Sequence, residues 1–405
     1  MRMLLRVLLG GLLFWLAYLN YQLYYRPQVE PVAGRPLNRD LLRQLRFLKA
    51  RLHQGAAGDM QELYPEGFVY LNALYGLTWA ELAAGVPPNA PLRREALAET
   101  RWAIRAIDSP VGKAQFEPNL PVPHGAYYRG WLTYLLGRYL AVQAPAERAA
   151  TDVRLFEQSC SRIAQGLARI PSPYPESYSG AAWPADAVMC VAALSWHDRI
   201  LPPRYQPTIG RWLAAVDTRL DSLGLIPHQT DARTGQALEA ARGSSQSQLL
   251  NFLFEVDSAY AQRHFRVYRA HFLTTRFGLP GVQESAQGST GVADIDSGPV
   301  LLGVGGAASI VGRRTFQRYG DTATAVGLRN SVEAFGIPLQ SGGRKRYLFG
   351  RLPIADAFIV WSNSLEINQP MAGSGSWRGG FQEISALVAA GLLAAWFGLR
   401  RKRGR

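Results

Sequence analysis

The chain of 405 residues has little charge, almost no lysine and only two cysteines, and these shortages exclude several protein classes. Charged residues make up 18% of the sequence and hydrophobic residues 48%, which is not the composition of a disordered protein. The arginines of the central region are scattered singly rather than clustered with aromatic residues, so we expect no nucleic-acid partner. Abundant Ala, Arg, Leu and Gly suggest a GC-rich bacterial genome.

The chemistry-bearing motifs that are missing narrow the function further. Cys160 and Cys190 are not part of a Cys-x-x-Cys or paired Cys/His pattern, so we predict no metal site and no cofactor. In an oxidising compartment the two cysteines could pair, and otherwise they are small buried apolar residues. A Gly-x-Ser-x-Gly elbow is also absent, which argues against a serine hydrolase.

Two apolar segments stand at the ends of the chain. Residues 3–25 form an apolar run with arginines at its start and tyrosines at its end, as at a membrane interface. A cleaved signal peptide begins similarly, but large aromatic residues stand where a small-x-small cleavage site is needed, which favours an uncleaved anchor. Residues 384–399 are apolar and precede the basic tail 400–405. They predict a short membrane span, the alternative being a buried C-terminal helix with a solvated tail.

The charge distribution predicts how these ends are oriented. Seven basic residues at the two ends supply half of the net charge of +14, and neither end contains an acidic residue. By the positive-inside rule both termini face the cytoplasm. We therefore expect an anchor at 1–25, a periplasmic domain at 26–370, a flexible tether at 371–383 and a second span with its tail at 384–405. The predicted location is a bacterial inner membrane, and the oligomeric state stays open.

The region between the ends reads as a series of helices joined by loops rich in proline and glycine. About eleven segments carry leucines and other apolar residues at helical spacing, and few alternate in the manner of strands. Consecutive helical hairpins of this kind suggest an all-α fold, an (α/α)6 barrel or toroid, which needs twelve helices. Polar and aromatic residues gather in the longer loops, where function is commonly placed, namely 55–67, 108–127, 171–186, 226–248 and 280–299.

The first two of these loops contain candidate acid/base and wall residues. Asp59 and Glu62, with Tyr64 beside them, could perform proton transfer, or they could serve helix capping and turns. His124 and Tyr128 could line a site, although a single loop histidine is more commonly just exposed.

The other three loops add carboxylates and an arginine. Asp186 is a candidate acid or base or a helix cap, and Trp183 beside it could form an aromatic wall. Arg242 could hold an anion at a helix start, where the neighbouring serines could equally act as caps. Asp294 and Asp296 lie one residue apart in a glycine-rich loop, which is costly unless the two are solvated, paired or functional.

At these loops the sequence resembles the linalool dehydratase/isomerase family, whose fold is an (α/α)6 barrel. The resemblance is clearest from about residue 125 to 310 and consists of an ordered series of short matches. Residues 128–131 match a Tyr-Lys-Gly-His helix start, and Ser177-Tyr178 match a Cys-Glu pair that precedes the family's second Cys, which falls at Asp186. Further short matches to the family lie at residues 197–200, 257–261, 283–286 and 294–298.

The departures from the family concern its site residues. Trp131, Ser177 and Asp186 stand where the family has its histidine and two cysteines, and Cys190 lies four residues past the second cysteine position. The resemblance therefore implies a fold and a site location, but not terpene alcohol dehydration.

The residues and the resemblance together suggest an enzyme with carboxylate acid/base chemistry in a loop-lined pocket. A lyase or isomerase acting on a hydrophobic alcohol or a lipid-linked substrate is the first hypothesis. A glycan-acting hydrolase of the cell envelope, which needs opposed carboxylates and aromatic platforms, is the alternative. A non-catalytic envelope protein that binds a ligand is the third.

Overall fold

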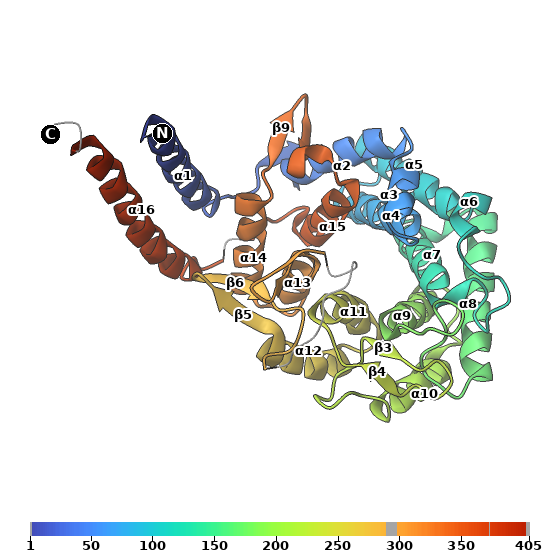
Figure 1. Ribbon diagram of the computed structural model, residues 1–405. Coiled ribbons are helices and arrows are strands. Elements are labelled where there is room, and N and C mark those ends of the chain that lie inside the picture. The colour runs from blue at the N-terminus through green and yellow to red at the C-terminus, as the bar shows by residue number, and fades with distance from the viewer. Residues whose placement is uncertain (1, 289–297, 372, 402–405) are drawn as a thin grey trace.

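The computed structural model describes residues 2–288, 298–371 and 373–401 of the chain. These residues contain sixteen α-helices, and their strands form only short two-stranded hairpins (Figure 1). The fold is therefore mostly helical, as the spacing of the apolar residues predicts.

The bounds of the elements are as follows. The helices are α1 (Arg2–Gln22), α2 (Arg39–Leu52), α3 (Ala56–Leu63), α4 (Gly67–Gly85), α5 (Pro91–Ile107), α6 (Pro110–Lys113), α7 (Gly125–Ala141), α8 (Ala150–Arg169), α9 (Pro184–Ile200), α10 (Gln206–Asp217), α11 (Gly243–Val256), α12 (Ser258–Phe272), α13 (Gly306–Arg318), α14 (Thr322–Phe335), α15 (Pro353–Asn363) and α16 (Trp377–Arg401). The antiparallel hairpins pair β1 (Val29–Val32) with β2 (Arg35–Asn38), β3 (Gln229–Thr230) with β4 (Ala237–Glu239), β5 (Leu273–Arg276) with β6 (Leu279–Val282), β7 (Val300–Leu301) with β8 (Val304–Gly305), and β9 (Leu339–Ser341) with β10 (Arg344–Arg346).

Six helices, which we call the inner helices, contact one another in succession: α4, α7, α9, α11, α13 and α15, with α15 packing back on α4 (Figure 1). Nearly every residue of α7 and α9 is buried, which explains why these segments are apolar all round. Outer helices cover them: α5 on α4, α8 on α7, α10 on α9, α12 on α11, α14 on α13 and α2 on α15. Outer helices such as α2 and α5 carry an apolar stripe and a polar face, because only one side of each is buried.

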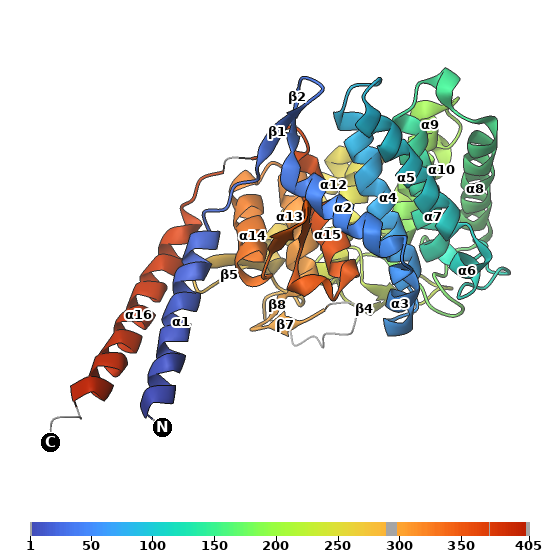
Figure 2. The same ribbon diagram turned by 90° about the horizontal axis from the view of Figure 1, so that it is seen from above.

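Helices α1 and α16 project from the body, which they contact at α14, and pack side by side with their free ends at the same side of the molecule (Figures 1 and 2). Met3–Gln22 and Trp377–Leu399 are long and apolar enough to cross a membrane, and few of their residues are buried. Gly10 allows the close contact between them, because a Cβ there would lie 2.9 Å from the Trp396 ring. These two helices support a membrane association of the protein.

The C-terminal helix begins earlier than the composition of the chain predicts. Residues 371–383 were expected to form a flexible tether, but α16 starts at Trp377, inside that range. Trp377 and Phe381 pack in a small apolar cluster with Leu19, Leu23 and Leu279. This packing compensates for the low helix propensity of the two glycines at 379–380, which local composition alone cannot anticipate.

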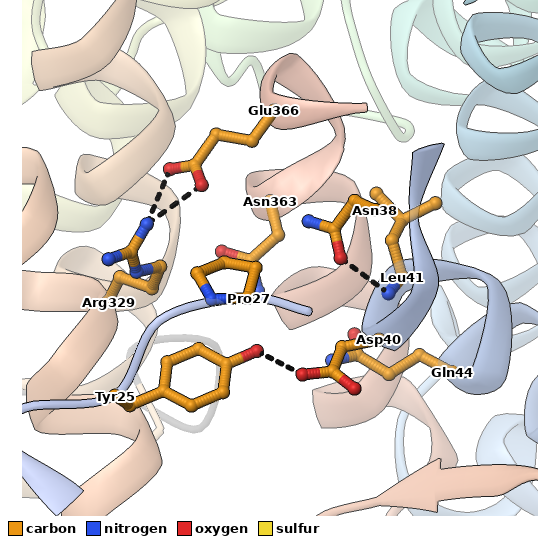
Figure 3. Close-up of a pocket in the computed structure, with 9 residues that line it drawn as sticks. All are labelled: Tyr25, Pro27, Asn38, Asp40, Leu41, Gln44, Arg329, Asn363 and Glu366. Carbon is orange, nitrogen blue, oxygen red and sulfur yellow. Dashed lines mark hydrogen bonds and ion pairs between the residues drawn. The ribbon is translucent and has the colours of Figure 1, made fainter. Parts of the chain in front are cut away.

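Buried polar and charged residues bind the segment that follows α1 to the body. A cavity of about 10 Å³, enough for one water molecule, lies between the segment after α1 and helices α2 and α14. Figure 3 shows the residues that line it. On one side the Tyr25 hydroxyl donates to Asp40 at 2.6 Å, and on the other Arg329 Nη1 lies 2.8 Å from Glu366 Oε2. Asn330 Nδ2 donates to the Leu23 carbonyl at 2.8 Å. The root of α1 is therefore bound firmly to the body.

Asp356, in the first turn of α15, is a buried carboxyl group whose titration should affect the stability of the fold. It is buried, its Oδ1 accepts from the Tyr347 N–H at 2.9 Å, and its Oδ2 has no partner among the described residues. Burial raises the pKa of the Asp356 carboxyl group from its ordinary value of 3.8 to about 8. The native state thus binds this proton more tightly than the unfolded chain does. The protonated carboxyl group therefore contributes fully to the free energy of unfolding below about pH 4, and this contribution is lost as the pH rises to about 8.

We expect Asp356→Asn to remove this pH dependence while keeping the acceptor for Tyr347. Relative to wild type, the variant should gain up to about 1.4 kcal/mol per pH unit between pH 4 and 8. Thermal unfolding of both proteins in detergent at pH 5 and pH 7.5 measures the difference in stability between variant and wild type at each pH. The effects of all other titrating groups are the same in both proteins and cancel in this difference. A difference between the proteins that is the same at both pH values would contradict the prediction.

Candidate functional site

The first turns of the inner helices gather at one end of the body. Tyr70 near the start of α4 contacts Tyr127 in the first turn of α7, and Ser247 near the start of α11 donates to the Ala308 carbonyl at the start of α13. The helices are therefore parallel, and the segments before them lie at the same end. Figure 2 shows α3, α6, β4 and the β7–β8 hairpin along this end, which we call the loop end.

A glutamate and a tyrosine form the first pair at the loop end. Glu66 directly precedes α4, and its Oε1 accepts from the Tyr178 hydroxyl at 2.5 Å. The Tyr127 hydroxyl donates to the backbone carbonyl of Glu66 at 3.1 Å. Burial, followed by the charge of Glu66, holds the pKa of Tyr178 well above its ordinary value. Tyr178 therefore remains a hydrogen-bond donor to the carboxylate.

An aspartate and a serine form the second pair. Asp186 lies in the first turn of α9, is 6% exposed, and its Oδ2 accepts from the Ser177 hydroxyl at 2.6 Å. The Ser177 hydroxyl also accepts from the Trp183 N–H at 3.3 Å. Gly125 allows this segment to approach α7, since a Cβ there would lie 2.0 Å from the Ser177 carbonyl oxygen. The two positions that the resemblance equates with the family's cysteines are thus in direct contact.

The two pairs are joined by the backbone. Ser177 and Tyr178 are consecutive, and each holds one carboxyl group, Asp186 and Glu66 respectively. A short bridge between Tyr178 and Ala181 fixes this turn, and Ala182 in turn pairs with Thr230 of β3. Two carboxyl groups that are distant in sequence therefore flank one dipeptide.

Aromatic rings surround the two pairs. The Tyr178 ring lies edge-on to Trp183 at 5.6 Å and stacks with Tyr127 at 6.2 Å between centroids. Tyr70 lies 5.1 Å from both Tyr127 and Trp131. Trp131 is fully buried, and its indole N–H has no acceptor among the described residues. Trp183, predicted as an aromatic wall, therefore belongs to one aromatic cluster with Trp131 and Tyr178, two positions that the resemblance places in the site.

Two further polar residues of the loop end, Glu66 and His228, are not among the residues that the sequence predicts. Glu66 lies in the predicted loop 55–67, in which the sequence favours Asp59 and Glu62. His228 precedes β3, and its Nδ1 lies 2.5 Å from the Ser245 hydroxyl in the first turn of α11. Only the placement of these residues in long polar loops could have indicated them. Arg242, predicted as an anion ligand, directly precedes α11 and is paired with Glu239.

Four other predicted residues lie outside the two hydrogen-bonded pairs, although the Phe116 ring contacts both Tyr128 and Tyr178. Asp59 and Glu62 are exposed on α3. His124 Nδ1 lies 3.1 Å from the Phe116 carbonyl, and the Tyr128 hydroxyl donates to the Ile107 carbonyl at the end of α5. The loop conformation and the helix face therefore direct these two side chains to neighbouring backbone.

The remaining predictions concern Tyr64, the aspartate pair and metal ligation. Tyr64 follows α3 and is half-buried against the core. Asp294 and Asp296 lie outside the described residues. In the part of the chain that the structure describes, no group of three His, Cys, Asp or Glu side chains could hold a metal ion.

The two cysteines are free and fully buried, Cys160 in α8 and Cys190 in α9. The Cys190 thiol donates to the Ala126 carbonyl at 3.4 Å, and burial raises the pKa of both thiols. Because both cysteines are free, the pairing considered above is not formed. Each thiol remains protonated and acts as a small apolar group.

The opposite end of the inner helices contains an open crevice of about 400 Å³ lined by Glu81, Arg138, Arg318 and Ser364, among others. Beside it, Glu255 accepts from Tyr134, Trp196, Arg138 and Arg318 at 2.6–3.2 Å. Although burial acts in the other direction, Arg318 and Arg138 lower the pKa of Glu255 to about 2. Glu81 is similarly paired with Arg314 and Ser364.

The Glu81 and Glu255 carboxylates at the crevice already accept several hydrogen bonds and ion pairs from side chains of the inner helices. Their arrangement fits a structural role, in which arginines also neutralise the negative helix C-termini. The loop end, where hydroxyl groups rather than arginines hold the carboxyl groups, is the better candidate site for proton transfer.

No family model and no curated protein sequence matches this chain. The geometry of the site therefore has to carry any functional conclusion.

Proposed function

We propose that the protein is a membrane-anchored enzyme that uses Asp186 and Glu66 as an acid/base pair. The single observation that carries this proposal is the Ser177-Tyr178 dipeptide, whose two hydroxyl groups hold these carboxyl groups at 2.6 and 2.5 Å. One carboxyl group would give a proton to a leaving oxygen while the other removes a proton from the substrate. The hydroxyl groups orient the carboxyl oxygens and can relay protons.

The scaffold of this proposal is an (α/α)6 barrel. The inner helices contact each other in a closed succession, and an outer helix covers each of them. Glu66 directly precedes α4 and Asp186 lies in the first turn of α9, so both carboxyl groups lie at the end where the inner helices start. The proposed location is a bacterial inner membrane with the body on the periplasmic side, for which the two apolar helices and the basic ends are the support.

A hydrophobic alcohol or a lipid-linked molecule is the proposed substrate, and a lyase or isomerase the proposed reaction type. The aromatic cluster of Tyr70, Tyr127 and Trp183 provides apolar walls, and the buried Trp131 N–H offers a donor to a substrate oxygen. The position of Ser177 and Asp186 in place of the family's cysteines means that carboxylate chemistry would replace thiol chemistry.

A glycan-acting hydrolase is the second candidate, favoured by the same aromatic rings. Glycoside cleavage needs two carboxyl groups about the bond and aromatic platforms for the sugar, and both types of residue occur here. A ligand-binding protein without catalysis would use the walls alone and would not depend on the carboxyl groups.

We expect Asp186→Asn and Glu66→Gln each to lower kcat/KM by about 10²- to 10⁴-fold, because each removes one proton-transfer group. The purified full chain is assayed with an acyclic isoprenoid alcohol, a polyprenol-linked sugar and a soluble oligosaccharide. Products are identified by mass spectrometry. Turnover of the alcohol supports the first candidate, and release of free sugar supports the second.

Glu157→Gln serves as the matched control, because Glu157 lies on the outer helix α8 with 41% of its side chain exposed. It should retain wild-type activity, and thermal unfolding should confirm that all three variants are folded. Substrate binding without turnover in the wild type, or equal rates in wild type and both site variants, would overturn the acid/base proposal.

A further inference from the structure

Large apolar side chains are exposed at the loop end of the body. Phe277 in the β5–β6 turn is 59% exposed, Leu302 in the β7–β8 turn 65%, and Phe349 before α15 61%. Leu63 at the end of α3 and Leu238 on β4 are also exposed. Such side chains on turns of a soluble surface lose favourable burial, so a cluster at one end of a body indicates an apolar partner.

The backbone at these turns gives an independent indication. Phe277, Leu302 and Phe349 have φ values of 50°, 53° and 61°, and each is followed by a glycine that also has positive φ. Turns of this shape favour Asn or Asp before the glycine, and a bulky residue there is strained. At the far end, the β1–β2 turn has the same backbone shape with the small pair Ala33-Gly34. Of these four turns, the three at the loop end carry a large apolar residue before the glycine, and the turn at the far end carries alanine.

The membrane helices extend on the side of the body where these turns lie. In Figure 2, α1 and α16 run from the body in the direction of the loop end, away from the β1–β2 hairpin. The β5–β6 turn adjoins the start of α16, since a Cβ on Gly278 would lie 2.2 Å from the Phe381 nitrogen. Arg378 Nε and Asn330 Nδ2 both donate to the Leu23 carbonyl at 2.8 Å. The roots of both helices are therefore bound to the body, which fixes its orientation.

We propose that the loop end rests on the lipid bilayer that α1 and α16 enter, with Phe277, Leu302 and Phe349 inserted among the lipid head groups and acyl chains. Aromatic and aliphatic side chains are the residues that bind this interface. The end of the body that holds Glu66 and Asp186 then faces the membrane. This last point rests on the proposed function, and it specifies the substrate as a lipid-soluble chain that enters from the bilayer.

Single cysteines test the contact directly, without any measurement of activity. Leu302→Cys and Phe349→Cys are made separately in the full chain, labelled with an environment-sensitive fluorophore and reconstituted in phosphatidylcholine/phosphatidylglycerol vesicles. Val29→Cys is the matched control, because Val29 is an apolar residue, 47% exposed, on β1 at the opposite end. Cys160 and Cys190 are buried and should not react, which labelling of the wild type checks.

We expect the labels at 302 and 349 to shift to shorter emission wavelength and to lose most of their fluorescence to spin-labelled lipids. The label at 29 should instead be quenched by aqueous iodide. Iodide quenching of all three positions alike would overturn the proposal, even if the acid/base variants behave as expected. Lipid contact combined with a failure of those variants would retain the docking surface and reject only the proposed reaction.

Discussion

Glu366→Gln is expected to lower the free energy of unfolding by about 3–5 kcal/mol, the usual cost of breaking a buried ion pair from one side. Glu366 is fully buried after α15, and its carboxylate is paired with both Arg313 and Arg329. Burial already lowers the pKa of Arg313 to about 10, with Glu366 acting in the other direction. Gln has the same shape, so the loss arises from two uncompensated guanidinium groups rather than from a cavity.

Denaturant unfolding in detergent measures this effect, and an exposed ion pair provides the control. Glu30→Gln breaks the pair with Arg39, in which 36% and 46% of the side chains are exposed, and should cost less than about 1 kcal/mol. Adding Arg329→Met to Glu366→Gln should cost less than the sum of the two single changes, because it removes one unpaired charge. A loss for Glu366→Gln no greater than that of Glu30→Gln would show that the pairing does not stabilise the fold.

Alkaline phosphatase fused after Arg405 is expected to be nearly inactive in bacteria, whereas a fluorescent protein at the same position should be bright. The basic residues 400–405 favour the cytoplasmic side, and α16 would separate them from the periplasm. Phosphatase inserted between Gly342 and Gly343, in the exposed β9–β10 turn, should instead be active because the body lies outside.

The C-terminal fusion distinguishes a span from the other interpretation of the last helix. If residues 384–399 instead form a C-terminal helix of the outer domain with a solvated basic tail, phosphatase would be active at both positions. Activity after Arg405 would therefore contradict the two-span topology, while the insertion at 342–343 verifies that the fusion is exported and folded. The same outcome would leave the helical body and its candidate site unaffected.

Helical structure could be predicted well because its signal is local. The apolar spacing along α2 and α5 follows from burial of one helix face, and α4, α7 and α9 are apolar all round because they are enclosed. Prediction failed at residues 377–383, where Trp377 and Phe381 pack on residues from distant parts of the chain. The exposed Phe349 was also not anticipated, because its glycine-containing turn has a conformation that normally favours Asn.

The sequence predicts the loops that supply the candidate site, but it does not predict which of their side chains meet. Asp186, Ser177, Tyr178 and Trp183 lie together, and they belong to one loop that the sequence indicated. Glu66 was passed over for Asp59 and Glu62, since all three carboxylates stand in the same loop and nothing local distinguishes them. The distinction comes from Tyr178, which lies 112 residues away and reaches Glu66 alone.

The sequence by itself determined the two apolar ends, the basic tail and the helical class, because each depends on the composition or spacing of neighbouring residues. Only the tertiary structure decided which polar groups meet. Glu66 with Tyr178, Asp186 with Ser177 and Glu366 with Arg313 are pairs whose partners are set by the packing of helices rather than by spacing along the chain. A buried charge or hydroxyl needs a partner, but any suitably placed residue can satisfy that need. The fold therefore selects the partner.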